Sequence, residues 1–221
     1  MLKFDLPDGR SVPVTVTTLL NAGYAGRSRD DVAAHVEELA ALGVPAPSAI
    51  PSLYPIGPYL AQQTDEVAVQ HGRTSGEAEW ALVITEVGTL LTAACDHTDR
   101  ALEAHGVAWS KQAGPDVLAT GAWLLDDVGD RIDDLELTGW ADDEVIQRGT
   151  LAELLPPTYW LDALRARDLL EPGTVLLSGT IPMRDGVDQF SSRWRVELRD
   201  PALRRSLGCS YRIRPLPEPI G

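Results

Sequence analysis

The chain has 221 residues, a formal net charge of −14, 44% hydrophobic residues and 24% charged residues. This length suits one large or two small domains and is sufficient to bury a substantial core. The negative charge repels a polyphosphate backbone and no basic stripe offsets it, so we expect no nucleic-acid partner. No apolar run approaches the roughly 20 residues of a membrane-spanning helix, so we expect no membrane contact either.

Cysteine usage and the first residues indicate the compartment. Only Cys95 and Cys209 are present, too few for a disulfide scaffold, and the N-terminal residues lack the apolar stretch of a signal peptide. We therefore expect a cytoplasmic protein.

The basic residues are unevenly divided. Seventeen are arginines and only two, Lys3 and Lys111, are lysines. An ammonium is a compact point charge and a guanidinium is not, so a lysine in such an arginine-rich chain is a candidate for a role that arginine cannot fill. Lys3 lies near the terminus, whereas Lys111 lies mid-chain and is a candidate functional residue.

The N-terminal part predicts a hairpin and then a helix. Leu2–Leu6 and Ser11–Thr17 flank the turn sequence Pro7-Asp8-Gly9, as in a β-hairpin. Ser28 begins a helix with a capping-box-like start, and Gly43 ends it. The proline-rich segment that follows, Pro45 to Pro58, is expected to be an ordered loop or a lid over a site.

Strand patterns dominate the rest of the chain, and one helix, about Pro157 to Leu169, interrupts them. The acidic stretch Asp126 to Asp134 predicts a solvated turn rather than a calcium loop, whose ligand alternation and central glycine are missing. The expected strands are Glu66–Gln70, Glu77–Thr85, Thr89–Cys95, Val117–Leu125, Asp134–Thr138, Thr174–Ser178, Trp194–Leu198 and Cys209–Ile213.

The commonest catalytic signatures are missing from the sequence. It contains no Gly-x-Ser-x-Gly elbow, phosphate-binding loop, Gly-x-Gly-x-x-Gly or Cys-x-x-Cys. The usual hydrolase, kinase and dehydrogenase interpretations are therefore not supported.

Two glutamates share one face of a predicted strand. Side chains alternate along a strand, so Glu77 and Glu79 project from the face that continues with Ala81 and Val83. Like charges buried side by side are costly unless a cation neutralises them, and hard divalent ions select carboxylate oxygens. The alternative is a strand entering from solvent with both glutamates exposed.

A third carboxylate follows the next strand. Asp96 comes directly after the apolar run from Leu90 to Cys95, and a hairpin would bring it beside the two glutamates to complete a three-oxygen site. His97 fits a packed or an exposed side chain better than a ligand of an oxygen-rich site. Asp99 and Arg100 suit the cap of a helical turn.

These residues together resemble the fumarylacetoacetate hydrolase superfamily over roughly Gly23 to Pro182. The superfamily pattern of Glu-x-Glu, then an Asp followed four positions later by an Arg, then a Lys, is matched by Glu77, Glu79, Asp96, Arg100 and Lys111. The resemblance implies that the three acids bind a divalent metal, Mg²⁺ or Mn²⁺. It also implies that Lys111 is catalytic and that the substrate contacts are Arg100, Thr180, Gln112 and Tyr54.

The resemblance extends upstream to a helix and fails in two places. His35 and Glu38 match the superfamily's His-x-x-Glu dyad, and their spacing lets Glu38 orient the imidazole on one helix face. A histidine beside an apolar stripe on a solvated helix would look the same. Tyr54 stands near the place of the usual Phe-x-Lys, and the sequence after Thr180 departs from the superfamily's, so no particular substrate is implied.

The resemblance implies one α+β domain with a mixed β-roll, which also forms a homodimer. Residues 1–65 would form the hairpin, helix and lid, and residues 66–221 the metal-binding roll. The expected activity is metal-dependent cleavage of a carbon–carbon bond next to a ketone, in a small 2-oxo acid or 1,3-dicarbonyl substrate. Decarboxylation, dehydration or tautomerisation at the same site, and a non-catalytic metal-binding scaffold, remain open alternatives.

Overall fold

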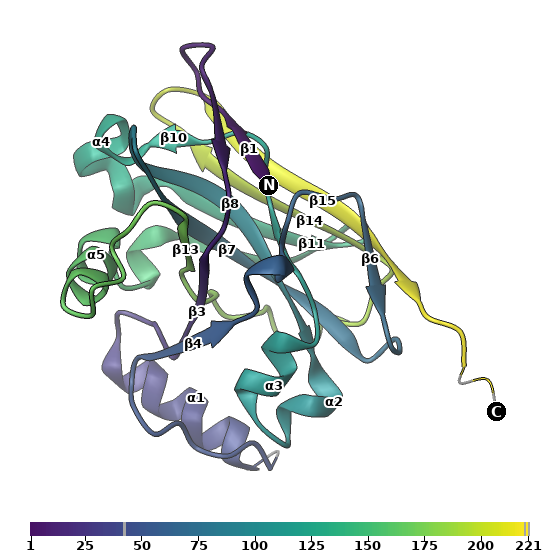
Figure 1. The fold of residues 1–221 in the computed structure, drawn as a ribbon. Coiled ribbons are helices and arrows are strands. Elements are labelled where there is room, and N and C mark those ends of the chain that lie inside the picture. The colour runs from purple at the N-terminus through teal and green to yellow at the C-terminus, as the bar shows by residue number, and fades with distance from the viewer. Residues whose placement is uncertain (42, 219, 221) are drawn as a thin grey trace.

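The computed structural model describes residues 1–41, 43–218 and 220, and the side chains of His35, Glu38 and Leu39 lie outside that description. Three β-sheets and a few short helices make up the described chain (Figure 1). The predicted mixed α+β class is confirmed. None of the described helices has the length and apolar composition required to cross a membrane.

The largest sheet carries the candidate site. It contains antiparallel pairs and two parallel pairs, β13 with β3 and β5 with β9. In spatial order its strands are β4 (Ser52–Ile56), β3 (Thr18–Gly23), β13 (Thr174–Leu177), β7 (Thr74–Thr85), β8 (Gly88–Asp99), β9 (Asp116–Leu118) and β5 (Ala61–Gln62), with β10 (Trp123–Leu124) also paired to β8.

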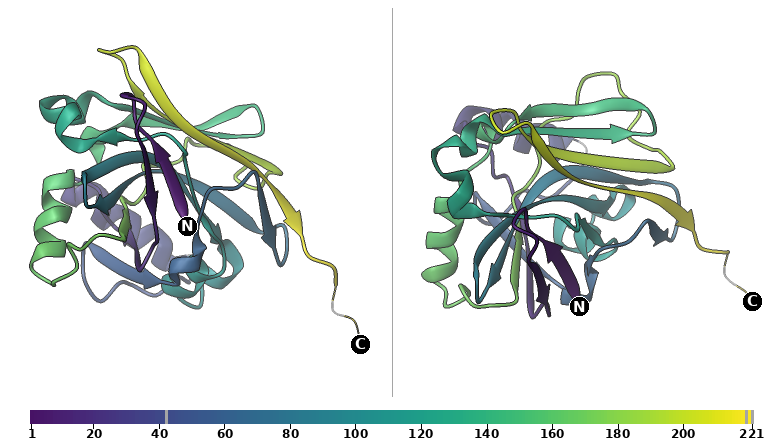
Figure 2. Two further views of the ribbon diagram at one scale, coloured as in Figure 1. Left: turned by 45° about the horizontal axis from the view of Figure 1, so that its top comes forward. Right: turned by 90° about the horizontal axis from the view of Figure 1, so that it is seen from above.

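A second sheet packs across β7 and β8 (Figure 2). Between the two sheets lies a core that includes Trp80, Leu82, Leu137, Trp194 and Val196. The strands of this second sheet are, in spatial order, β12 (Glu144–Thr150), β11 (Glu136–Ala141), β14 (Arg193–Asp200), β15 (Arg205–Pro215) and β6 (Glu66–Val69).

The predicted N-terminal hairpin is confirmed as β1 (Leu2–Asp5) and β2 (Ser11–Val14). Its apolar side chains contribute to a second core on the opposite face of the large sheet, together with Ala81 and Val83 of β7. The alternation expected along β7 is thus also confirmed, because Ala78 and Trp80 belong to the core on the other face.

Short helices surround the sheets, and α1, α2 and α3 lie together at one end of the molecule (Figure 1). Ser28 accepts a hydrogen bond from the Asp31 amide at the start of α1, as the sequence predicts. The helices are α1 (Arg29–Ala41), α2 (Arg100–Glu103), α3 (Val107–Gln112), α4 (Leu125–Val128) and α5 (Pro157–Arg165), with 3₁₀ turns η1 (Pro58–Leu60), η2 (Gly129–Asp134) and η3 (Leu151–Glu153).

Several predicted boundaries were wrong. The segment from Pro45 to Pro58 contains strand β4, and Pro55 is tolerated there because β4 lies at the edge of the sheet. The expected strand from Val117 to Leu125 is two strands, β9 and β10, whose intervening residues run past β8. The acidic stretch from Asp126 to Asp134 forms the helical turns α4 and η2, not a simple turn.

Candidate metal centre

Strands β7 and β8 form a long hairpin that brings three carboxylates together. Glu77 and Glu79 share one face of β7, and Asp96 lies directly opposite Glu77 in the β7–β8 register. Asp96 therefore lies within β8, not after its end as expected. One carboxylate oxygen from each of the three residues lies within 4.8 Å of the other two. The predicted convergence of these acids is confirmed.

Lys111 lies among these carboxylates. It is on the last turn of α3 with 5% of its surface exposed, and its Nζ donates to Asp96 Oδ2 and, at 3.3 Å, to Glu77 Oε2. Gly114 lets the chain after α3 approach β8, since a Cβ there would come within 1.8 Å of the His97 carbonyl oxygen. Lys111 is therefore a buried helical residue and does not lie on an exposed turn between strands.

Arg100 holds the outer side of the site. Asp99 caps α2 through the amides of Ala101 and Leu102, which places Arg100 immediately after β8. The Arg100 guanidinium donates to Glu77 Oε1 at 2.8 Å and also to Glu103 and Ser75. All of these contacts are with protein groups, so Arg100 fixes Glu77, and its expected substrate contact stays a prediction.

The charges around Glu77 keep it ionised. Burial alone would raise the pKa of Glu77, but the positive charges of Arg100 and Lys111 outweigh burial and lower that pKa to about 2. For Lys111, burial acts to lower the pKa, but Asp96 and Glu77 raise it well above the ordinary lysine value. Lys111 is therefore an ammonium at neutral pH and serves as a positive charge rather than as a base.

Glu79 has a different environment. It is fully buried, its Oε2 accepts a hydrogen bond from the Gly179 amide at 2.8 Å, and its Oε1 has no hydrogen-bond partner among the described residues. Burial, together with the charges of Asp96 and Glu77, raises the pKa of Glu79 well above its ordinary value, although Lys111 opposes this. An unpartnered buried carboxylate oxygen beside two further carboxylates fits a hard divalent cation.

The sequence did not point to two further polar residues of the site, Asp116 and Asn21. Asp116 on β9 lies opposite Asp96 and is fully buried, as is Asn21 on β3. Asn21 Nδ2 donates to Asp116 Oδ1 at 3.2 Å. Strands β13, β7 and β8 lie between β3 and β9 in the sheet, so this hydrogen bond requires the sheet to curl around the site.

The expected substrate contact of Thr180 is not tested, but its hydroxyl already has protein partners. Thr180 Oγ1 donates to the Ala78 carbonyl at 2.8 Å and accepts from Gln147 Nε2 at 2.7 Å. Gln147 also accepts from the Ala78 amide and is fully buried. These bonds fix the loop after β13 against β7, beside Glu79.

Gln112 and Tyr54 lie at the periphery. Gln112 is exposed, accepts from the Gly57 amide at 2.8 Å and donates to the Tyr59 hydroxyl at 2.8 Å, so it joins α3 to the chain after β4. Tyr54 is half-buried on β4, with its ring against Gly23. Their substrate contacts stay predictions, as do the roles of His35 and Glu38, whose side chains lie outside the described part.

His97 faces away from the acids. Its Nδ1 shares a hydrogen bond with the Tyr211 hydroxyl at 2.8 Å, and its Nε2 shares one with Thr74 Oγ1 at 2.9 Å. Burial lowers the pKa of His97 to about 3, so its ring is neutral between the two sheets. Of the two placements left open by the sequence, packed or exposed, the structure shows the packed one.

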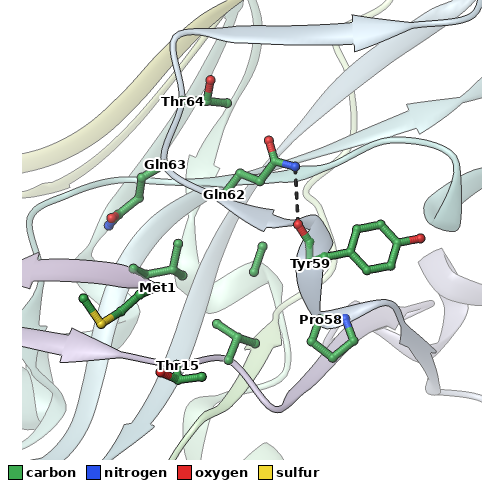
Figure 3. Close-up of a pocket in the computed structure, with 10 residues that line it drawn as sticks. Met1, Thr15, Pro58, Tyr59, Gln62, Gln63 and Thr64 are labelled. Carbon is green, nitrogen blue, oxygen red and sulfur yellow. Dashed lines mark hydrogen bonds between the residues drawn. The ribbon is translucent and has the colours of Figure 1, made fainter.

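A groove of about 550 Å³ lies between the N-terminal hairpin and the segment around η1 and β5. Figure 3 shows Gln62 donating a hydrogen bond to the Tyr59 carbonyl on one side of it, with Met1 and Thr15 on another. Its lining contains no carboxylate, lysine, arginine or histidine. This groove therefore offers no charged side chain for catalysis, in contrast to the acids of β7, β8 and β9.

Solved structures with the same fold are similar over nearly the whole chain. A fumarylacetoacetate hydrolase family protein from Yersinia pestis CO92 is 18% identical with a TM-score of 0.65, covering 96% of this chain and 100% of that one. 2-Keto-3-deoxy-D-arabinonate dehydratase complexed with magnesium and 2,5-dioxopentanoate is 19% identical with a TM-score of 0.62, covering 96% of this chain and 79% of that one.

Maleylpyruvate hydrolase from Sphingobium sp. SYK-6, in complex with manganese(II) and pyruvate, is 14% identical with a TM-score of 0.59, covering 94% of this chain and 77% of that one. No curated protein shows significant sequence similarity to this chain. The fold is that of the fumarylacetoacetate hydrolase proteins, as the sequence motifs imply. A family model described as "Protein of unknown function (DUF2848)" matches residues 22–211, so the chain belongs to that family.

Proposed function

We propose that this protein is a divalent-metal-dependent enzyme that cleaves a carbon–carbon bond next to a ketone, in a 2-oxo acid or 1,3-dicarbonyl substrate. The observation that carries the proposal is the convergence of Glu77, Glu79 and Asp96 around the Lys111 ammonium. The fold likeness to enzymes crystallised with magnesium or manganese and small oxo compounds supports it.

The charges at the site favour a divalent ion. Four buried or nearly buried carboxylates, those of Glu77, Glu79, Asp96 and Asp116, face the Lys111 ammonium. The Arg100 guanidinium forms ion pairs with both Glu77 and Glu103. Burial raises the pKa of Glu79 and of Asp116 well above the ordinary values, and a bound divalent ion would favour the carboxylate form of both. An oxygen-rich site of this kind suits Mg²⁺ or Mn²⁺.

Glu77, Glu79 and Asp96 would hold the ion, which supplies Lewis-acid stabilisation of a developing enolate when bound. Lys111, held as an ammonium, adds a second positive charge beside the same position. Arg100 keeps Glu77 ionised and aimed inward. The proton acceptor assigned by resemblance is His35, oriented by Glu38.

The test is turnover of a panel of acylpyruvates and oxaloacetate, followed as loss of ultraviolet absorbance. We expect turnover with Mg²⁺ or Mn²⁺, none after chelation with EDTA, and recovery when the ion is restored. Product analysis then separates hydrolysis from decarboxylation, dehydration and tautomerisation. If the protein binds the metal but no compound is converted with any ion, the enzymatic proposal fails and a metal-binding scaffold replaces it.

A further inference from the structure

Asp116 extends the row of acids on β7 and β8 by one strand. Glu77 lies opposite Asp96, and Asp96 lies opposite Asp116, so the three carboxylates follow one another across β7, β8 and β9. Directly opposed residues of antiparallel strands share a face of the sheet. Asp116 is fully buried, although no described lysine or arginine donates a hydrogen bond to it.

Asn21 reaches Asp116 from the far side of the curled sheet. Its Nδ2 donates to Asp116 Oδ1 at 3.2 Å, and both side chains have 0% exposure. Asp116 Oδ2 and Asn21 Oδ1 find no hydrogen-bond partner among the described residues. Both unpartnered atoms are acceptors, and buried acceptors are stabilised by positive charge or by donors around a cation.

The middle residue of this row, Asp96, already has hydrogen-bond partners for both carboxylate oxygens. Thr98 Oγ1 donates to Asp96 Oδ1 at 3.3 Å, and Lys111 Nζ donates to Asp96 Oδ2. Thr98 and Lys111 therefore satisfy Asp96, and Asp116 lies next to it as a further buried acid, whose pKa burial and the Asp96 charge raise well above the ordinary value.

We propose that Asp116 and Asn21 are positioning residues that form an outer layer of the metal centre. This inference rests on the proposed metal site at Glu77, Glu79 and Asp96. When a cation is bound, Asp116 would add a further carboxylate next to Asp96, and Asn21 fixes the orientation of the Asp116 side chain by its amide hydrogen bond. Outer residues of this kind change metal affinity without contacting the ion.

The alternative is a purely structural role, in which the hydrogen bond between Asn21 and Asp116 only links β3 to β9 and stabilises the curled sheet. The two roles differ in what a substitution changes. If the role is purely structural, a substitution lowers thermal stability with or without metal and leaves the metal dissociation constant unchanged. If the two residues position the metal ligands, a substitution weakens metal binding in a protein that is still folded.

The experiment is a Mn²⁺ titration of the full chain, followed by electron paramagnetic resonance of the free ion, with circular dichroism to check the fold. Asp116→Asn keeps the shape and removes the charge. The matched control is Asp200→Asn, a fully buried acid of β14 in the other sheet, paired with Arg131 and Arg205. We expect Asp116→Asn to bind Mn²⁺ about tenfold to a hundredfold more weakly, and Asp200→Asn to bind as the wild type does.

The swapped double variant Asn21→Asp/Asp116→Asn restores one carboxylate and one amide to the pair, and we expect it to recover most of the lost affinity. If Asp116→Asn does not fold, Asn21→Ala carries the test, because it frees the Asp116 carboxylate and should also weaken binding. Wild-type affinity in a folded Asp116→Asn, or in Asn21→Ala where the former is unfolded, would overturn this inference alone. Absence of saturable Mn²⁺ binding by the wild type would overturn the metal centre with it.

Discussion

Glu77 on β7 lies directly opposite Asp96 on β8, and the Lys111 ammonium donates a hydrogen bond to both carboxylates. This arrangement joins a hairpin and a helix through one buried cation. Two of the three proposed metal ligands thus accept hydrogen bonds from the same lysine. The predictions below test what each of these groups contributes.

Glu79→Gln should abolish tight metal binding while leaving the fold intact. The amide oxygen of glutamine can still accept the hydrogen bond from the Gly179 amide, but the ligand loses its negative charge. We expect Mg²⁺ or Mn²⁺ affinity to fall by at least about tenfold in isothermal titration calorimetry. Glu66→Gln, which alters a glutamate on β6 in the other sheet, is the control. Equal affinities of Glu79→Gln and wild type would remove Glu79 from the ligand set.

Without added metal, stability should depend on pH through Glu79. Its pKa in the folded protein is well above the ordinary value of 4.5, so above that pH the folded state retains a proton that the unfolded state has lost. The free energy of unfolding should therefore fall as pH rises above 4.5 towards the folded-state pKa. Chemical denaturation at several pH values should show a smaller fall for Glu79→Gln; identical pH profiles would contradict this account.

The same protonation sets the pH dependence of metal affinity. A divalent ion needs the carboxylate form of Glu79, so binding releases the proton that burial holds there. Affinity should rise with pH over the same range, and calorimetry in buffers of different ionisation enthalpy should detect the released proton. Binding that is independent of pH from about 5 to 8 would argue that Glu79 is already ionised.

Lys111→Ala should lower turnover much more than it affects folding. Removing one positive group beside a developing oxyanion commonly costs about a hundredfold or more in turnover. Lys111→Arg should not restore activity, because a planar guanidinium cannot occupy the site of a compact ammonium. Lys3→Ala, at the other and exposed lysine, is the matched control. Full activity of a metal-loaded Lys111→Ala variant would exclude Lys111 from the mechanism.

Gly114→Ala tests how α3 is held against β8. The added methyl group would meet the His97 carbonyl oxygen at 1.8 Å, so the chain after Lys111 must move. We expect a loss of roughly 2 kcal/mol or more in the free energy of unfolding. In Gly72→Ala the new methyl group meets no atom within 4 Å, so its stability should change by less than about 0.5 kcal/mol. Similar melting temperatures for the two variants would disprove the close approach.

The segment expected to close over the site runs from His35 to Pro58, and within it α1 should respond to ligand whereas β4 should not. Helix α1 carries His35 and Glu38, whereas β4 is hydrogen-bonded along its length to β3. Adding Mn²⁺ with oxalate, whose two carboxylates imitate a 2-oxo acid enolate, should slow hydrogen exchange in α1. Equal exchange with and without these ligands would identify α1 as fixed scaffold and His35 as a packing residue.

The placement of the three proposed metal ligands could be predicted from the sequence because it depends on local rules. Alternation along one strand puts Glu77 and Glu79 on the same face, and a short turn sets the register of the hairpin that brings Asp96 opposite Glu77. Lys111 stood out by composition alone. Its position beside Asp96 depends on the helix α3, which has only six residues and is too short to show a helical pattern of apolar residues.

Asn21 and Asp116 could not be predicted in this way. They are 95 residues apart, on strands separated by three others, and only the curl of the sheet brings them together. Asn21 lies within an apolar segment whose strand, β3, was missed, and Asp116 begins a strand of three residues. A buried asparagine in an apolar run was the one available signal, and it does not identify its partner.

A crystal structure of the protein soaked with Mn²⁺ and oxalate tests the central claim most directly. We predict one anomalous scattering peak bounded by Glu77, Glu79 and Asp96, with a carboxylate oxygen of each residue at about 2.0 to 2.3 Å from the ion and oxalate bound to it. The result that would contradict the account is the three carboxylates lying more than about 8 Å apart, or an ion bound elsewhere while these acids stay paired with Lys111 alone.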